Sequence, residues 1–343
     1  TTQLAALPAS PDGTLDAAQR VLVLQQGDLR EKIDKTQVSG GARSAGGFSL
    51  GPASGPAGPV SPTPVLSAIL AALAGGLVGL LTVAVLEVLD DTISGAGDVG
   101  PAARRLPCLA EVPRANKVEA VSLDHPTHPA AEAFRSVRTG LPFVTTGGVP
   151  RVIHITSANP GEYKTTTAVN LAVTFAATGR RVCLVSCDLR RPRLEAVLGV
   201  ANTEGFTSVI LGAARLGEVL VAVQRQSHLY LLPTGPIPPN PAEVIKSSMA
   251  HTIFARLRAE FDVVVIDSAP VLPVTDAAVL SGQADLTILV VAAGRTTRAD
   301  LDRAVEILDQ VSAPIGALVI NHPARDRWLV RAKAPERMSA HLS

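Results

Sequence analysis

Ten residues at positions 156–165 constrain the fold of this chain more than any other segment. They read Thr-Ser-Ala-Asn-Pro-Gly-Glu-Tyr-Lys-Thr, after a β-branched run at 151–156 and before an apolar helical pattern that begins near Lys164. A strand, a short glycine-containing loop and a helix in this order predict a phosphate-binding loop, because consecutive backbone N–H groups then converge on a phosphate at the helix N-terminus. The alternative interpretation is a turn that only caps the helix.

Tyr163 stands where such loops carry glycine. Glycine before the lysine lets the backbone wrap around a phosphate without a Cβ atom in the way. A tyrosine there is expected to strain the loop, to crowd the nucleotide or to swing outward as a lid. We further expect the Lys164 ammonium to reach the β- and γ-phosphates of ATP and the Thr165 hydroxyl to bind Mg²⁺.

Beyond the loop, the chain alternates strands with helical patterns. Strand-like runs fall near 151–156, 181–186, 228–232, 262–267, 286–291 and 315–320. This alternation, with the loop, predicts an α/β fold of the P-loop NTPase type, in which a mostly parallel sheet carries helices on both faces. A length of 343 residues indicates two or three domains, and a hydrophobic content of 47% supplies enough aliphatic side chains for the core.

Polar residues follow several of these strands. Ligands bind such sheets at the carboxyl ends of the strands, where Thr156, Asp188, Asp267 and Asn321 fall. Asp267 ends an apolar run that begins at Phe261, and a carboxylate in this place is a candidate to hold Mg²⁺ opposite the phosphate loop. The alternative is an aspartate that simply begins a turn.

A charge-free segment at residues 65–86 differs from the rest of the chain. As a helix it would cover roughly 30 Å of hydrocarbon, which predicts one transmembrane helix; the alternative is an unusually apolar buried helix. It lies deep in the chain and lacks the basic leader of a signal peptide. Neighbouring charges specify its orientation poorly, but ATP is cytoplasmic, so we expect the residues after it inside the cell and residues 1–64 outside.

The remaining segments complete the predicted organisation. In the extracytoplasmic part, residues 14–34 have the spacing of an amphipathic or coiled-coil helix, and residues 39–64 are a linker rich in Gly, Pro and Ser. Residues 87–125 are predicted as a juxtamembrane linker, residues 126–322 as the nucleotide-binding domain and residues 323–343 as a basic tail. That tail is expected to be solvated, and its alternative role is contact with anionic lipid.

Composition narrows the possible partners. A net charge of +1 argues against a dedicated nucleic-acid-binding protein. Cys108, Cys183 and Cys187 have no metal-ligand spacing with histidines, so they are interpreted as reduced core residues.

Several motifs together resemble one family. The segment 157–166, the Asp-Leu-Arg-Arg-Pro run that begins at Asp188 and Asp-Ser-Ala-Pro from Asp267 are similar to motifs of the bacterial tyrosine kinases of polysaccharide export. The segments Pro236-Ile-Pro-Pro-Asn-Pro-Ala-Glu-Val-Ile and Gly316-Ala-Leu-Val-Ile-Asn also look like that family. Residues flanking the apolar segment resemble the second membrane span of a chain-length regulator fused to such a kinase. The resemblance covers about residues 40–322.

The resemblance implies a membrane-anchored ring of subunits that binds Mg-ATP, phosphorylates tyrosines in neighbouring C-terminal tails and controls capsule or exopolysaccharide assembly. Glu132, Arg135 and Arg138 resemble the family's oligomerisation motif, although charges at this spacing are also ordinary on a solvated helix. Asp188 and Asp267 resemble its second and third acidic motifs. The predicted catalytic residues are Lys164, Asp188 and Asp267; the predicted metal ligands are Thr165, Asp188 and Asp267; the predicted nucleotide-binding residues are Pro160, Gly161, Glu162, Lys164, Thr165, Thr166 and Asn321.

The chain departs from the family at three places. Tyr163 replaces glycine, Ser186 replaces an aspartate two residues before Asp188, and the tail after Asn321 has no tyrosine. The whole chain contains two tyrosines, Tyr163 and Tyr230. Loss of the carboxylate at position 186 removes a candidate for metal binding or for activation of the acceptor hydroxyl, and general-base catalysis typically contributes about 10²-fold or more.

Three functional hypotheses follow. The first is an ATP-dependent protein-tyrosine kinase of polysaccharide biosynthesis that acts on a partner. The second is a non-catalytic scaffold or chain-length regulator of the same system, in which the altered site at most senses nucleotide. The third, a partition-type ATPase, is disfavoured by Asn159, where those proteins carry an early lysine, and by the apolar segment.

Overall fold

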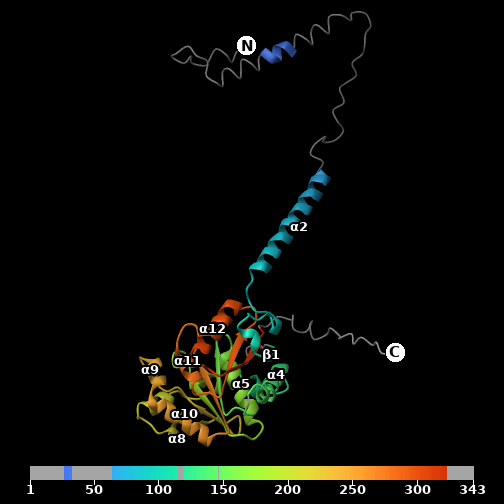
Figure 1. Ribbon diagram of the computed structural model, residues 1–343. Coiled ribbons are helices and arrows are strands. Elements are labelled where there is room, and N and C mark those ends of the chain that lie inside the picture. The colour runs from blue at the N-terminus through green and yellow to red at the C-terminus, as the bar shows by residue number, and fades with distance from the viewer. Residues whose placement is uncertain (1–26, 33–63, 114–118, 146, 323–343) are drawn as a thin grey trace, which may run out of the picture. The chain divides into compact units, whose positions relative to one another are not determined.

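The computed structural model describes residues 27–32, 64–113, 119–145 and 147–322 (Figure 1). The chain divides into two units, Thr1–Leu81 and Thr82–Ser343. Residues 27–32 are helical, and the rest of the helix predicted at 14–34 lies outside the described residues. The predicted linker at 39–64, apart from Pro64, and the predicted tail at 323–343 also lie outside them.

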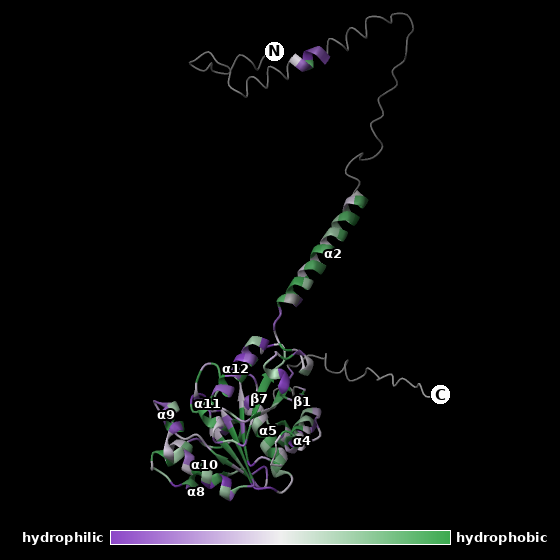
Figure 2. Cartoon of the chain, viewed as in Figure 1, coloured by the Kyte–Doolittle hydropathy of each residue, from purple (hydrophilic) through white to green (hydrophobic). Residues whose placement is uncertain are grey.

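The apolar segment forms one continuous helix, α2 (Pro64–Leu89). Its stretch Val65–Glu87 is long and apolar enough to cross a membrane, and none of it is buried. Figure 2 shows hydrophobic residues along its whole length, and residues 65–86 contain no charged side chain. A helix that is apolar on all sides suits a hydrocarbon environment, whereas the surface helix of a soluble domain carries a polar face.

Eight strands form a single sheet in the order β1-β8-β7-β2-β6-β3-β5-β4. They are β1 (Cys108–Val112), β2 (Val152–Ser157), β3 (Val182–Cys187), β4 (Val221–Ala222), β5 (Leu229–Leu232), β6 (Val263–Ser268), β7 (Leu286–Ala292) and β8 (Ile315–Asn321). All neighbours are parallel except β4, which pairs antiparallel with β5. The predicted mostly parallel sheet is therefore confirmed, and the six predicted strands each begin and end within one residue of their expected positions.

Helices cover both faces of this sheet, as predicted (Figure 1). They are α3 (Val121–Asp124), α4 (Pro129–Gly140), α5 (Lys164–Ala176), α6 (Leu194–Leu198), α7 (Phe206–Ile210), α8 (Leu216–Val219), α9 (Pro241–Lys246), α10 (Ser248–Glu260), α11 (Asp276–Ser281) and α12 (Arg298–Gln310), with short 3-10 helices η2 (Ala96–Asp98), η3 (Ala103–Arg105) and η4 (Leu141–Phe143). On β2, Ile153 packs in the core formed with α4 and α5, and its neighbour Val152 packs on the opposite face with α10. Alternate residues of a strand point to opposite faces, so a strand buried on both faces is apolar throughout.

The segment after α2 differs from the predicted linker at 87–125. β1 pairs with β8 at one edge of the sheet, and Ile93 and Ala103 are fully buried in the core formed with α12. Arg298, at the start of α12, forms ion pairs with Asp91 and Asp98. Thus most of the described residues between 90 and 112 belong to the folded domain rather than to a free connection.

Candidate functional site

The predicted phosphate loop connects the central strand β2 to the buried helix α5. Its last residue, Tyr163, has φ 66° and ψ 21°, which is the left-handed region, and Gly161 has φ 79°. Glycine populates this region without steric cost, whereas a residue with a Cβ atom is strained there. The conformation thus explains why glycine is expected at position 163. Tyr163 retains the turn that starts α5, at a cost in backbone strain.

A cavity of about 620 Å³ opens beside this loop. It is lined by Pro160, Gly161, Tyr163, Lys164, Thr165 and Thr166 of the loop and α5, by Asp188, Arg190, Arg191 and Arg193 after β3, by Ala269, Pro270, Pro273 and Val274 after β6, and by Glu119. The carboxyl ends of β2, β3 and β6 therefore meet at one cavity, as expected for ligand sites in parallel sheets. The cavity contains five of the seven predicted nucleotide-binding residues.

Lys164 and Asp188 form a buried ion pair in this cavity. The Lys164 Nζ atom lies 2.7 Å from Asp188 Oδ2, and the two side chains are 11% and 6% exposed. The other carboxylate oxygen of Asp188 accepts a hydrogen bond of 3.0 Å from the backbone N–H of Arg191. Both charges are thus compensated within the protein, and the Lys164 ammonium lies on the cavity wall where a phosphate would replace or join its carboxylate partner.

Thr165 and Asp267 form the second contact. The Thr165 hydroxyl donates a hydrogen bond of 2.7 Å to Asp267 Oδ2, whereas Asp267 Oδ1 is buried without a hydrogen-bond partner. Burial raises the pKa of Asp267 to about 6, and the nearby Lys164 charge and the Thr165 hydrogen bond oppose that shift.

These oxygens suit Mg²⁺, which takes hard oxygen ligands and uses only one or two from the protein when it binds with a phosphate. The unpaired Asp267 Oδ1 and the Thr165 hydroxyl are the two protein oxygens that such an ion would need. No cluster of three or more His, Cys, Asp or Glu side chains suited to a metal occurs among the residues that the structure describes. The donor set therefore fits an ion that shares its coordination with phosphate and water, and it does not fit a closed structural metal site.

The Glu162 side chain does not line the cavity, and its prediction as a nucleotide-binding residue of the loop stays a prediction. Its carboxylate is fully buried and accepts hydrogen bonds from the Asn159 N–H at 2.8 Å and from the Thr296 hydroxyl at 2.6 Å. Asn159 in turn donates from its side chain to Asp300 at 2.9 Å. Burial raises the pKa of Glu162. Glu162 therefore fastens the phosphate loop to the start of α12.

Asn321 and Ser186 also lie away from the cavity lining. Asn321 ends β8 and donates from its side chain to the Thr167 hydroxyl on α5 at 3.2 Å, and its role in nucleotide binding stays a prediction. Ser186 is buried on β3 directly beside Asp267 and accepts a hydrogen bond of 2.8 Å from the Thr234 hydroxyl. An aspartate at position 186 would stand next to Asp267, and this chain has the uncharged Ser186 side chain there instead.

The predicted oligomerisation residues make contacts within the chain. On α4, Arg135 Nε lies 2.8 Å from Glu132 Oε2, and Arg138 Nη1 donates to the backbone carbonyl of Thr174 at 2.6 Å. Glu132 is exposed, and the two arginines are partly buried. Their role between subunits stays a prediction.

Sequence reasoning missed two groups of residues at the site. Arg191 and Arg193 line the cavity, although the motif that contains Arg191 and immediately precedes Arg193 was interpreted only as a family resemblance. Thr296 and Asp300 hold the loop from the opposite side, more than 130 residues further along the chain. A capping signal at the start of α12 can be found in the sequence, but its contact with the phosphate loop depends on tertiary structure.

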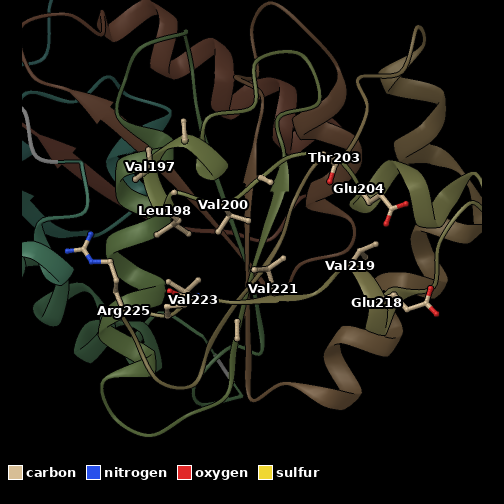
Figure 3. A pocket seen from close by; sticks show the side chains of 15 residues that line it. Val197, Leu198, Val200, Thr203, Glu204, Glu218, Val219, Val221, Val223 and Arg225 are labelled. Carbon is tan, nitrogen blue, oxygen red and sulfur yellow. The ribbon is translucent and has the colours of Figure 1, made fainter.

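Another cavity, of about 730 Å³, lies at the β4 edge of the sheet (Figure 3). Val197, Val200 and Val221 form much of its wall, with Glu204 and Glu218 at one side. It contains no residue of the phosphate loop and no cationic side chain other than Arg225. The smaller cavity therefore remains the candidate site, because it combines the loop with converging charges.

Comparisons with known proteins agree with this geometry. A family model described as an AAA domain matches residues 150–315. The tyrosine-protein kinase YwqD of Bacillus subtilis is 36% identical over 201 residues, which cover 59% of this chain and 84% of the relative. The tyrosine-protein kinase wzc of Salmonella typhimurium is 29% identical over 212 residues, which cover 61% of this chain and 29% of the relative.

Solved structures show the same fold. The crystal structure of the chimerical protein CapA2B2 has a TM-score of 0.60 and 29% identity to this chain, and the match covers 63% of this chain and 94% of the other. The BceF tyrosine kinase domain has a TM-score of 0.60 and 27% identity, with 67% and 99% covered. The sheet, the loop and the cavity thus belong to a P-loop NTPase-type fold that is shared with kinase domains.

Proposed function

Because the chain belongs to the bacterial tyrosine-protein kinase family, we propose that its folded domain binds Mg-ATP beside the phosphate loop and transfers the γ-phosphate to a tyrosine of a partner protein. The proposed partners are proteins of capsular or exopolysaccharide biosynthesis. The match covers 29% of the length of wzc. The activity of such a longer protein is therefore proposed for this chain.

One observation supports nucleotide binding above the others. Lys164 and Thr165 are adjacent at the start of α5, and each already contacts a carboxylate from a neighbouring strand end, Asp188 or Asp267. A bound triphosphate brings its own negative charge to the same place, so Lys164 exchanges Asp188 for phosphate oxygens. The helix N-terminus and the loop N–H groups then stabilise the β-phosphate.

The proposed transfer requires little covalent chemistry from the protein. The acceptor tyrosine oxygen bonds to the γ-phosphorus, the bond from that phosphorus to the β–γ bridging oxygen breaks, ADP leaves and the phenolic proton is lost to solvent. Mg²⁺, when bound, neutralises the phosphate oxygens, and Thr165 and Asp267 are the residues that would hold it. Lys164 orients the transferred group and stabilises its charge.

We also propose that α2 anchors the chain in the cell membrane, with the kinase-like domain on the cytoplasmic side where ATP is available. Its length and uniformly apolar surface support this. Assembly into a homo-oligomer through Glu132, Arg135 and Arg138 is the proposed quaternary arrangement, because Glu132 is exposed on α4. A chain-length role in polysaccharide synthesis belongs to the same proposal.

Two observations favour a second candidate function, a non-catalytic scaffold or chain-length regulator. Tyr163 lies in the left-handed region and lines the cavity, where the family carries a glycine without a side chain. Ser186 puts a hydroxyl where a second carboxylate would stand beside Asp267. A site altered at both positions retains the means to hold a nucleotide but has fewer groups to activate an acceptor hydroxyl.

Calorimetric titration of the full-length chain in detergent with Mg-ADP tests nucleotide binding. Lys164→Gln serves as the blank, because the amide still donates a hydrogen bond toward Asp188 and avoids a buried unpaired carboxylate. Phosphotyrosine formed from ATP on a Glu–Tyr copolymer tests transfer. Binding with transfer supports the kinase, binding alone supports a scaffold that senses nucleotide, and no binding at millimolar Mg-ADP contradicts the kinase and leaves a scaffold that does not use nucleotide.

A further inference from the structure

The mouth of the nucleotide cavity is positively charged. Four cationic side chains line it, namely Lys164, Arg190, Arg191 and Arg193, against two carboxylates, Glu119 and Asp188. The three arginines all follow β3 and precede α6, so they occupy one side of the opening. A cationic rim beside a site for a transferred phosphate attracts anionic groups on whatever enters next.

The four cationic side chains differ in how firmly carboxylates of the protein hold them. Lys164 is held by Asp188, and Arg190 is held through two hydrogen bonds, of 2.8 and 3.2 Å, by the fully buried carboxylate of Asp276. The Arg190 guanidinium is therefore engaged within the protein, where it connects the segment after β3 to Asp276. In the proposed complex Lys164 turns to the nucleotide phosphates, so neither side chain is available to a second ligand.

Arg191 and Arg193 are more available. Arg193 pairs with Glu119, but the two side chains are 62% and 37% exposed, and exposed pairs of this kind exchange partners at little cost. Arg191 is exposed, its backbone N–H is bonded to Asp188, and its guanidinium has no hydrogen bond or ion pair within the described part of the chain. These two guanidinium groups are suited to bidentate contacts with carboxylates of a ligand.

The two tyrosines and the C-terminal segment of this chain are not suited as ligands of the arginines at the cavity opening. Tyr230 lies on β5 with its ring against Phe261, at a centroid distance of 5.5 Å, and Tyr163 belongs to the phosphate loop itself. The segment 323–343 contains no tyrosine and carries five Lys and Arg residues against two Asp and Glu residues. A segment of that charge is repelled by a cationic opening.

We propose that Arg191 and Arg193 are specificity-determining residues that select an acidic, tyrosine-bearing segment of another polypeptide. This rests on the proposed kinase function and names its substrate class. Carboxylates flanking the acceptor tyrosine pair with Arg191 and Arg193 and place its hydroxyl at the opening above Lys164. Nucleotide phosphates are held by the loop and Lys164, so the two arginines are not needed for nucleotide binding.

The test compares three fluorescently labelled peptides that share one central tyrosine and differ only in acidic, neutral or basic flanks. Fluorescence anisotropy with the full-length chain in detergent gives affinity with and without Mg-ADP, and phosphate transfer from ATP gives kcat/KM for each peptide. The expected result is a preference of about ten-fold or more for the acidic peptide that weakens as salt is raised.

The double variant Arg191→Glu/Arg193→Glu is expected to lose about ten-fold in affinity for the acidic peptide, to gain affinity for the basic one and to lose less affinity for Mg-ADP than for the acidic peptide. Arg191→Lys/Arg193→Lys keeps the charge and should keep most of the preference. Arg303→Glu is the matched control, because Arg303 also forms an exposed ion pair, with Glu306, away from the cavity lining. Melting temperature checks that each variant is folded.

Equal affinity for all three peptides overturns the proposal, as does a double variant that loses Mg-ADP affinity while its peptide preference is unchanged, since the arginines would then be nucleotide ligands. An acidic-peptide preference without phosphate transfer supports the docking surface and contradicts the kinase. Transfer to all peptides at one rate supports the kinase and contradicts the docking surface.

Discussion

Tyr163 combines a glycine-like backbone with the bulkiest side chain in the phosphate loop. A non-glycine residue in the left-handed region costs roughly 1 kcal/mol, and this one also lines the nucleotide cavity. We expect Tyr163→Gly to remove both penalties, so that Mg-ADP binds several-fold more tightly. Isothermal titration calorimetry of the two full-length chains measures the difference.

Tyr163→Ala separates strain from crowding. Alanine keeps the Cβ atom and hence the backbone strain, but it removes the ring from the cavity wall. If affinity rises equally in both variants, crowding dominates; if only the glycine variant gains, strain dominates. A loss of affinity in both variants would contradict the prediction and would show that the ring supports the nucleotide as a lid.

His154 links three strands in the middle of the sheet. It lies on β2, and its ring nitrogens contact Ser268 on β6 at 2.7 Å and Thr287 on β7 at 3.3 Å. Burial lowers its pKa to about 3, from an ordinary value of 6.5. The folded state thus holds His154 neutral over a range in which the unfolded state takes up a proton.

The lowered pKa of His154 determines how the stability of the domain changes with pH. A group with a lowered folded-state pKa makes the unfolded chain bind more protons below pH 6.5, so stability falls as the pH falls through that value. Between pH 7 and pH 5 the contribution of His154 to the free energy of unfolding is expected to drop by about 2 kcal/mol. Urea denaturation of wild type and His154→Gln at both pH values measures it as a difference.

That difference isolates His154 from other titrating groups. Asp267 has a raised pKa of about 6. Between its ordinary pKa of 3.8 and pH 6, its contribution to the free energy of unfolding therefore rises as the pH falls, which is opposite to that of His154. It is present in both chains and cancels in the comparison. If the stability gap between the two chains stays constant from pH 7 to pH 5, the neutral buried state of His154 is contradicted.

Two loops near the β5 end of the sheet approach each other closely at Gly205. A Cβ atom there would lie 2.1 Å from the Pro233 carbonyl oxygen and 2.6 Å from the Gly235 nitrogen, both backbone atoms. The same Pro233 oxygen accepts a hydrogen bond of 2.7 Å from the Phe206 N–H. We expect Gly205→Ala to destabilise the domain by about 2 kcal/mol or more, because the backbone itself has to move. Urea denaturation gives the value.

Gly217 provides the matched substitution. It lies in α8, and a Cβ atom at this position would meet nothing within 4 Å. Gly217→Ala is expected to be neutral or to stabilise by up to about 1 kcal/mol, because alanine favours helix over glycine. If Gly205→Ala and Gly217→Ala changed the free energy of unfolding by the same amount, the prediction that the close backbone approach at Gly205 excludes a side chain would be contradicted.

The elements show which structural features the sequence could predict. The six main strands were predictable because each is an apolar run with clear boundaries, and the loop was predictable from its glycine, lysine and threonine between a strand and a helix. β1 was missed because its five residues are mostly half-buried at an edge and their partner β8 lies about 200 residues away. β4 was missed because it has two residues. Edge elements depend on tertiary pairing, which local patterns do not encode.

Among the residues of the site, too, some features could be predicted from the sequence and others could not. Strain at Tyr163 was one of the outcomes expected from the glycine preference of the loop, and the structure shows it as a left-handed backbone conformation. The role of Glu162 was not, because its partner Thr296 is 134 residues away in the sequence. Residue types in a motif identify the chemistry of a site, whereas side-chain direction depends on the surrounding fold.

Across the whole molecule, apolar surface is divided between two kinds of environment. In the domain, large apolar side chains are mostly buried between the sheet and its helices, whereas on α2 they are exposed on every side, for example Leu77 at 59% and Leu80 at 69%. A soluble monomer rarely leaves so much contiguous apolar surface in water. A lipid bilayer is the environment that matches the length of this helix.

We therefore expect the full-length chain to fractionate with membranes and to resist extraction at alkaline pH. Leu77→Arg combined with Leu81→Arg places two charges at the middle of α2, each costing about 2.5–3.5 kcal/mol at a membrane centre, and should release the chain from the membrane fraction. Leu211→Arg changes an equally apolar, 70% exposed side chain of the domain and should leave fractionation unchanged. Membrane retention of the double variant would contradict anchoring by α2 and would direct attention to the basic segment at 323–343, whose charge suits anionic lipid.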